Sequence, residues 1–268
     1  MSFKELYYKI IQNQEAKLTE RVLSEFVKVK SYAEKIDVIK NKIRRGEFDL
    51  QDDELWELYA ISCVLDVLTL RYQPNNNADE SNWLGPDLSL EHILEFIDKI
   101  GLTSKPVNYF HTFSCEIIEA IPGEKNFDIA KVFFPSIFIE NLIIKRAGVQ
   151  ITLNPIQFNL KLVNNTSIYW EHIRKNRNFY NQSQGWGGNS QWRTCFRIDL
   201  ETKENYIYNF NGNLNLNKPS SKEIDYLKDN GIKLEEAIEL LKYRHFLNVS
   251  KNDNDLYPYQ FRFEEEKV

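Results

Sequence analysis

Cysteine is scarce in this sequence. The 268 residues include three cysteines, Cys63, Cys115 and Cys195, which lie far apart and are odd in number. Such a set fits reduced thiols better than a disulfide framework, because disulfides pair cysteines and are typical of oxidising compartments. Each cysteine is therefore interpreted as a small apolar residue that faces the core.

Long apolar runs are missing as well. The apolar-rich stretches 55–70 and 132–144 are interrupted by Asp66, Pro135 and Glu140, and both fall short of the ~20 residues that span a bilayer. The first residues carry charges and amides where a signal peptide would need an apolar region. We therefore expect a cytoplasmic protein without a membrane partner.

Positive charge is not in excess. The net charge is −5 and the isoelectric point is about 5.6, so no global positive field draws the chain to nucleic acid or to an anionic membrane. The chain is 42% apolar, 27% charged and 13% aromatic, which is typical of a folded protein. Nucleic acid is thus the less expected partner, and any anion binding must be local.

Complete catalytic and metal-binding motifs are also lacking. No GxSxG, P-loop or kinase signature is present. The four histidines, His92, His111, His172 and His245, show no HExxH, HxH or Cys/His metal spacing. The sequence therefore predicts no metal and no cofactor, and an enzyme is the less favoured class.

Apolar residues recur at helical spacing through most of the first hundred residues. The stretch from Asp52 to Tyr72 is apolar on most sides and should be the central buried helix of an N-terminal helical layer. The polar stretch 73–81 is typical of a surface loop. From Val107 to Val149, short apolar runs leave strand and helix open. The helices expected in this half cover 18–29, 32–43, 52–72 and 90–100.

Alternation of apolar and polar residues, typical of strands, marks the second half. Segments 192–200 and 206–210 alternate and are joined by a polar loop, so they should form an antiparallel hairpin. Trp192, Phe196 and Ile198 would be buried on one face of its first strand.

Further elements are expected on both sides of this hairpin. Segments 156–162 and 257–263 also alternate and are predicted as strands, with 264–266 as a solvated tail. Ser220-x-x-Glu223 is a capping box that predicts a short helix, and a second helix should cover 234–246.

Helices early in the chain and strands later, without regular βαβ alternation, favour the α+β class. We expect a helical N-terminal layer followed by a C-terminal half that contains an antiparallel sheet. The two parts would be a mainly helical 1–150 and a sheet-plus-helix 151–268. One domain, or two domains that meet near 150–155, are both open.

The most informative segment is 171–199, which reads EHIRKNRNFYNQSQGWGGNSQWRTCFRID. Arginines and aromatic residues alternate along it in an otherwise acidic protein. These residue types hold phosphates and stack on bases, and they also form hot spots in protein interfaces. The candidate binding residues are Arg174, Arg177, Tyr180, Trp186, Arg193 and Arg197.

A purely structural role for these arginines competes with binding. By alternation, Arg193 and Arg197 should share a strand face with Asp199. A buried arginine without a carboxylate or a bound anion carries a large desolvation cost. A structural role therefore predicts protein carboxylates at both guanidiniums, whereas a functional role leaves at least one facing a cleft.

Glu171 and His172 are adjacent and lie near Arg174, so they are candidates for a general base with an electrostatic clamp in phosphodiester chemistry. Adjacent residues on a helix or strand point in different directions, so the two side chains need not converge.

The string NSQWRT at 189–194, followed by Phe196 and Arg197, resembles a block in uncharacterised bacterial proteins, some of which resemble immunity proteins of toxin systems. The resemblance covers 185–210 and the 234–246 helix, and it carries over no catalytic residue. It implies a cytosolic protein that neutralises a protein toxin by occluding its active site, and the acidic net charge suits a basic groove on such a toxin. The alternative is a phosphate- or nucleic-acid-directed enzyme or binding module that uses the segment from Arg174 to Arg197. The oligomeric state is open.

Overall fold

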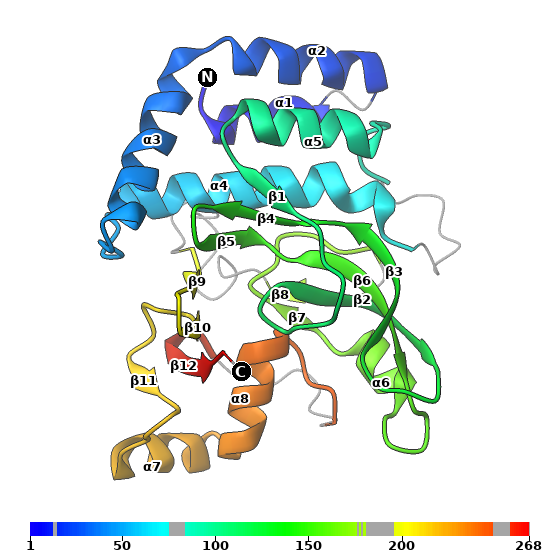
Figure 1. The fold of residues 1–268 in the computed structure, drawn as a ribbon, viewed down its shortest axis with the longest axis vertical. Coiled ribbons are helices and arrows are strands. Elements are labelled where there is room, and N and C mark those ends of the chain that lie inside the picture. Colours follow the sequence, from blue (N-terminus) through cyan, green and yellow to red (C-terminus); the bar gives the residue numbers. More distant parts are fainter. Residues whose placement is uncertain are drawn as a thin grey trace.

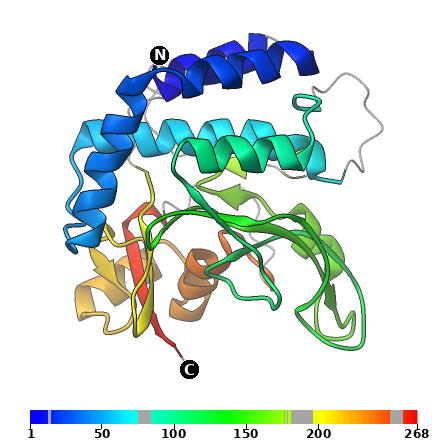
Figure 2. The same ribbon diagram turned by 45° about the horizontal axis from the view of Figure 1, so that its top comes forward.

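Helices form one layer over a set of twisted strands in the computed structural model of the chain (Figure 1). The structure describes residues 1–12, 15–74, 84–175, 177, 179–180, 196–248 and 258–267. Turned forward in Figure 2, the blue and cyan N-terminal helices lie above the sheet and the orange C-terminal helices lie on its other side. The chain is therefore α+β, as predicted, with helices concentrated early and strands later.

Helices α1 to α5 make up the N-terminal layer, and none of the helices in the described ranges is both long and apolar enough to cross a membrane. The helices are α1 (Phe3–Gln12), α2 (Ala16–Val27), α3 (Lys30–Arg44), α4 (Asp52–Thr69), α5 (Leu90–Lys99), α6 (Leu160–Asn165), α7 (Ser221–Asp229) and α8 (Leu234–Tyr243), with 3-10 turns η1 (Leu70–Tyr72) and η3 (Pro258–Gln260).

The largest sheet has the strand order β1-β4-β5-β9-β10-β12-β11, and it is antiparallel except for the β11–β12 pair. It combines strands from both sides of residue 150. A three-stranded sheet has the order β2-β6-β3, and β7 pairs with β8. The strands are β1 (Thr103–Lys105), β2 (Cys115–Pro122), β3 (Asp128–Phe134), β4 (Ser136–Ile139), β5 (Leu142–Lys145), β6 (Ala147–Leu153), β7 (Ile168–Tyr169), β8 (Phe179–Tyr180), β9 (Asp199–Glu201), β10 (Asn205–Tyr208), β11 (Leu214–Asn215) and β12 (Phe261–Glu266).

Helix α4 is the central buried helix that its composition predicted. Leu58, Leu65 and Leu68 are completely buried in the largest core, which also contains side chains of α1 to α3 and α5. The helix begins with a capping box in which the backbone N–H of Gln51 donates to Glu54 at 2.7 Å. Three charged residues of this helix are buried, Glu54, Glu57 and Asp66, and Asp66 is the least exposed of them.

The seven-stranded sheet is covered on both faces. On β4, Ile137 and Ile139 belong to the core beneath the helical layer, whereas Phe138 belongs to the core formed with α7 and α8. A strand buried on both faces has no polar side, so it reads as a continuous apolar run. This is why the apolar runs that form β4 and β5, within 107–149, could not be separated from helices by periodicity.

The predicted hairpin is confirmed where the structure describes it. Strands β9 and β10 pair antiparallel, with Leu200 opposite Ile207. Phe196 and Ile198 are buried as expected, and Trp192 lies outside the described residues. The alternation does not, however, leave one polar face: Arg197 and Asp199 are buried as well, because α8 covers the second side.

Two predictions about the second half are wrong. Segment 156–162 is not a strand: residues 155–157 form a turn, Ile156 is 92% exposed, and α6 begins at Leu160 with Asn159 as its cap. Pro155 and the capping Asn159 outweigh the short alternation. Residues 264–266 are not a solvated tail, since they belong to β12, which pairs with β10.

Candidate functional site

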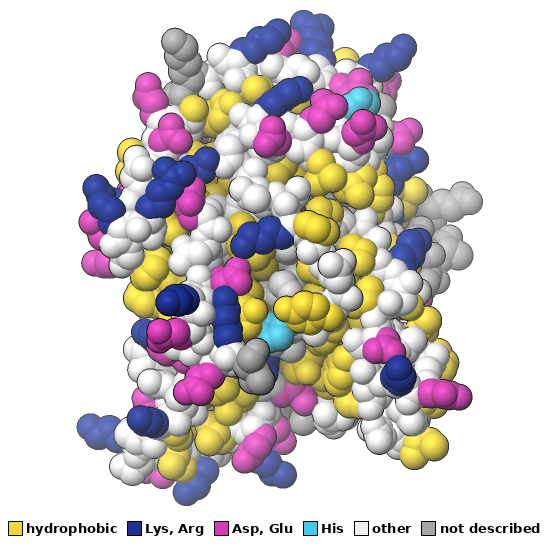
Figure 3. All heavy atoms as spheres, viewed as in Figure 1, with side chains coloured by type: hydrophobic (Ala, Val, Ile, Leu, Met, Phe, Trp, Pro, Cys, Tyr) yellow, Lys and Arg dark blue, Asp and Glu magenta, His cyan; other side chains and the backbone are white. Residues whose placement is uncertain are grey.

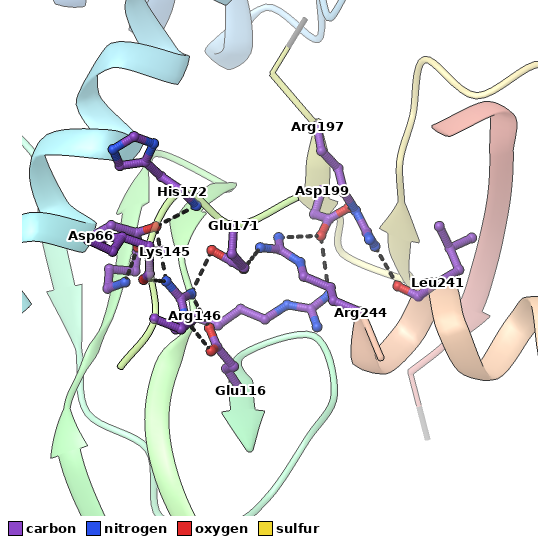
Figure 4. Close-up of polar contacts among 12 residues, drawn as sticks. Asp66, Glu116, Lys145, Arg146, Glu171, His172, Arg197, Asp199, Leu241 and Arg244 are labelled. Atoms are coloured by element: carbon purple, nitrogen blue, oxygen red, sulfur yellow. Dashed lines mark hydrogen bonds and ion pairs between the residues drawn. The ribbon is translucent and has the colours of Figure 1, made fainter. Parts of the chain in front are cut away.

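The described part of segment 171–199 leads into a buried group of charged side chains. We call the ionic cluster the set Asp66, Glu116, Lys145, Arg146, Glu171, Arg174, Arg197, Asp199 and Arg244, all of which are buried. Figure 4 shows Glu171 between the side of the cluster around Asp66 and the side around Asp199. The cluster therefore joins α4, the two larger sheets and the end of α8.

Arg174 is the centre of the first side. Its Nε and Nη2 donate to the two carboxylate oxygens of Glu116, each at 2.6 Å. Its Nη1 lies 3.0 Å from Asp66 Oδ2, and its Nη2 lies 2.6 Å from Glu171 Oε2. Lys145 pairs with the other oxygen of Asp66. One guanidinium thus neutralises parts of three carboxylates that come from three separate segments.

Asp199 is the centre of the second side. Its Oδ1 accepts from Arg197 Nε at 2.7 Å, and its Oδ2 lies 3.2 Å from both Arg146 Nη2 and Arg244 Nη2. Arg244 also pairs with Glu171, which connects the two sides. Arg244 is the left-handed residue after α8, with φ of 64°, so the end of that helix aims its side chain into the cluster.

The guanidinium of Arg197 binds groups in the protein interior. Besides Asp199, its Nη2 donates to the carbonyl of Leu241 at 2.6 Å, and its guanidinium lies 4.3 Å from the centre of the Trp170 ring. A structural role for Arg197 predicted a carboxylate partner, and Asp199 is that partner. The contacts of Arg197 therefore support a structural role, and its side chain does not face open solvent.

The charged side chains of the ionic cluster shift one another's pKa values. Burial alone would raise the pKa of Asp66, but Arg174 and Lys145 lower it below the usual range. Burial would likewise raise the pKa of Asp199, and the surrounding arginines lower it. Burial lowers the pKa of Arg197 to about 9, although Asp199 acts against this. A carboxylate with a lowered pKa is a weak base, so Asp66 and Asp199 are unsuited to proton abstraction near neutral pH.

Positive charge is in excess in the cluster, which has five basic and four acidic members. Each arginine around Asp199 also retains one buried nitrogen without a hydrogen-bond partner among the described residues. These nitrogens are Arg146 Nε, Arg197 Nη1 and Arg244 Nε.

Glu171 and His172, the candidate general base, do not meet. The carboxylate of Glu171 faces Arg174 and Arg244, whereas the ring of His172 lies against α1, with its Nε2 2.8 Å from the hydroxyl of Tyr7. The backbone N–H of His172 donates to Asp66 at 2.9 Å. Burial lowers the pKa of His172, which favours the neutral ring.

The other candidate binding residues are only partly described. Arg177 is partly buried and donates to the carbonyls of Val163 and Ile117. Tyr180 ends β8, and its side chain lies outside the described residues. Trp186 and Arg193 also lie outside them, so the carboxylate partner expected for Arg193 stays a prediction.

Sequence reasoning missed most of the cluster. Asp66, Lys145 and Arg146 each interrupt or end an apolar run, and Arg244 stands between the apolar residues of α8 and Phe246. A lone charge in an apolar run is costly to bury without a partner, so each of these positions signalled an internal ion pair. A lone charge in an apolar run does not, however, identify the residue with which it pairs.

Over the ranges that the structure describes, no three or more His, Cys, Asp or Glu side chains are grouped so that they could hold a metal ion. Cys63 and Cys115 are buried free thiols. No family model, no curated protein and no solved structure matches the chain.

Proposed function

We propose that this protein is a binding protein of the immunity or antitoxin type, which neutralises a protein toxin in the cytoplasm by covering its active site. The observation that carries the proposal is the internal use of Arg174 and Arg197. Both arginines were candidates for binding phosphate, and their guanidiniums pair with buried carboxylates instead. The case for a phosphate-directed enzyme is weakened accordingly.

Burial removes little of the acidity of the chain from the surface that the structure describes. Among the described residues, five basic and six acidic side chains are buried, a balance of −1, whereas the net charge of the whole chain is −5. Basic and acidic side chains are intermixed over the face in Figure 3, and the residues described there form no continuous basic stripe. Complementary charge of this sign would speed association with a basic groove.

An exposed acidic and aromatic surface lies where α4 begins. Asp49, Asp52 and Asp53 are exposed there, and they line a hollow together with Trp56. The indole Nε1 of Trp56 is shielded and has no hydrogen-bond partner among the described residues. Tryptophan is enriched among the residues that carry binding energy in interfaces, so this surface is the first to test.

The experiment expresses the product of each neighbouring gene alone and together with this chain. We expect one product to arrest growth, the chain to relieve the arrest, and the two purified proteins to associate at a rate that falls as salt is added. A triple variant, Asp49→Asn, Asp52→Asn and Asp53→Asn, should slow association. The matched control removes the same charge from Asp225, Asp229 and Glu235, which are exposed on α7 and α8.

The opposite outcome is equally definite. If no neighbouring product is toxic and the chain instead binds RNA or DNA with an affinity that falls steeply with salt, the immunity proposal is wrong. Released counterions would then indicate contacts with phosphates, and the alternative function through the segment from Arg174 to Arg197 would stand.

A further inference from the structure

A very small pocket lies between the end of the α4–η1 segment, strand β2 and the chain after β7. Its free volume is about 10 Å³. A space of this size holds about one water-sized particle, so it admits a monoatomic ion and excludes phosphate or a nucleotide. The lining residues are Gln73, Glu116, Ile117, Ile118, Arg174 and Arg177.

Gln73 brings an unused donor to this pocket. The side chain is 5% exposed, and its Nε2 is buried without a hydrogen-bond partner among the described residues. Its Oε1 accepts from the backbone N–H of Lys175 at 3.3 Å, which fixes which end of the amide is the donor. A buried donor that stays unpaired is destabilising, so a partner at this nitrogen would stabilise the fold.

Arg177 brings an uncompensated charge. Its guanidinium donates to two backbone carbonyls, and no carboxylate among the described residues lies within ion-pair distance of it. Burial lowers the pKa of Arg177 to about 10, and the nearby Arg174 adds to this effect while Glu116 opposes it. The two carbonyl groups accept from only part of the guanidinium, which has five N–H donors, and they leave its charge unbalanced.

The one carboxylate in the lining is already engaged. Both oxygens of Glu116 accept from Arg174 at 2.6 Å, so it is not free to compensate Arg177. The ionic cluster behind it has five basic and four acidic members, and Arg177 makes the count six to four. Excess positive charge in a poorly solvated region favours a negative ligand.

We propose that this pocket binds one halide ion, chloride under ordinary conditions, held by the amide Nε2 of Gln73 and the guanidinium of Arg177. The ion is a structural ligand and is independent of the immunity function. A water molecule would satisfy the amide but would leave the charge of Arg177 unbalanced, which is why an anion fits better.

The first test compares thermal melting in sodium chloride, sodium bromide and sodium gluconate at equal ionic strength. Gluconate is too large for the pocket. We expect a higher melting temperature in chloride and bromide, with a saturating dependence on halide concentration, because a ligand bound only by the folded state stabilises it by mass action. Crystals soaked in bromide should show an anomalous peak between Gln73 and Arg177.

Variants make the test specific. Gln73→Glu places a carboxylate beside Arg177, so we expect its melting temperature to lose the halide dependence. Arg21→Gln removes an exposed arginine of α2 and should keep that dependence, which separates binding from general screening. Equal melting of the wild type in chloride and gluconate would overturn the proposal, as would bromide crystals without a peak at this site. A bromide peak without any effect on melting would indicate an adventitious ion only and would overturn it too.

Discussion

Arg174 and Glu116 face each other in the protein interior through two parallel hydrogen bonds, each 2.6 Å long. The two residues are 58 positions apart and lie on the chain after β7 and on β2, respectively. Paired geometry of this kind is the strongest form of arginine–carboxylate contact. It fixes the segment that carries Glu171 and His172 against the three-stranded sheet.

Glu116→Gln tests this pair. The change leaves Arg174 with less negative charge around it in a buried site, and breaking a buried pair by removing one partner costs roughly 3–5 kcal/mol. We expect a loss of that size in the free energy of unfolding measured by urea titration. Glu25→Gln, which breaks the exposed pair with Arg21, is the control and should leave the midpoint nearly unchanged. Similar losses in both variants would contradict a central role for the buried pair.

Asp199→Asn tests the second side of the cluster. The variant removes the one charge that Arg146, Arg197 and Arg244 share, so a loss of roughly 3–5 kcal/mol is again expected. Removing one arginine at the same time, in Asp199→Asn with Arg197→Met, should recover part of the loss, since fewer unpaired charges remain. Additive losses in the double-mutant cycle would show that Arg197 and Asp199 are not coupled.

The layer of helices could be predicted because its signal is local. Helix α4 shows apolar residues on most sides, and α7 begins at the capping box of Ser220 and Glu223 that its sequence contains. The β9–β10 hairpin is also local. The ionic cluster is not, since Asp66 and His172 meet across 106 positions, and no spacing rule joins residues so far apart.

Burial on both sides explains why this part of the candidate site is internal. Alternation correctly placed Phe196 and Ile198 on the core side, and it left open whether Arg197 and Asp199 face outward or into a second layer. Helix α8 covers that second face, and this arrangement depends on contacts that the sequence of 192–200 does not contain. Arg174 looked like a binding residue because two of its carboxylate partners, Asp66 and Glu116, lie elsewhere in the chain.

Gly148→Ala tests the packing of the three-stranded sheet. A Cβ at this position would lie less than 3.0 Å from three atoms of the Phe134 ring, which is buried opposite Gly148 in the β3–β6 pair. Overpacking of this kind typically costs about 1–3 kcal/mol. Thermal melting should show the loss, and Phe134→Leu in the same chain should reduce it by making room. A double variant with fully additive losses would contradict this contact.

The stability of the fold should fall below pH 6.5 because of His245. This side chain is completely buried, its Nδ1 lies 3.1 Å from the carbonyl of Phe246, and its Nε2 has no hydrogen-bond partner among the described residues. Burial lowers its pKa well below the usual value, and the charges of Arg177 and Arg146 lower it further. A proton on His245 would add a buried cation to a region that already has an excess of them.

The sign follows from which state takes up the proton. Above the unfolded pKa of about 6.5, His245 is neutral in both states and its contribution to stability is complete. As the pH falls below that value, the unfolded chain binds a proton that the folded chain rejects, so stability drops by up to about 1.4 kcal/mol per pH unit. The pKa values of Asp66 and Asp199 are also lowered, but their contribution is lost only below about pH 4, which separates the two effects.

Urea titrations between pH 7.5 and 4.5 check this prediction. We expect His245→Gln to flatten the dependence in this window, because glutamine does not titrate. Thr166→Ala is the matched control: it removes the hydroxyl near His245 Nδ1 without removing a titratable group, so it should lower stability by the same amount at every pH. His172 and His111, whose pKa values burial also lowers, account for the slope that remains in His245→Gln. An unchanged slope in His245→Gln would contradict the prediction. His245 would then take up a proton in the folded chain as readily as in the unfolded chain, although Arg146 and Arg177 place positive charge near it.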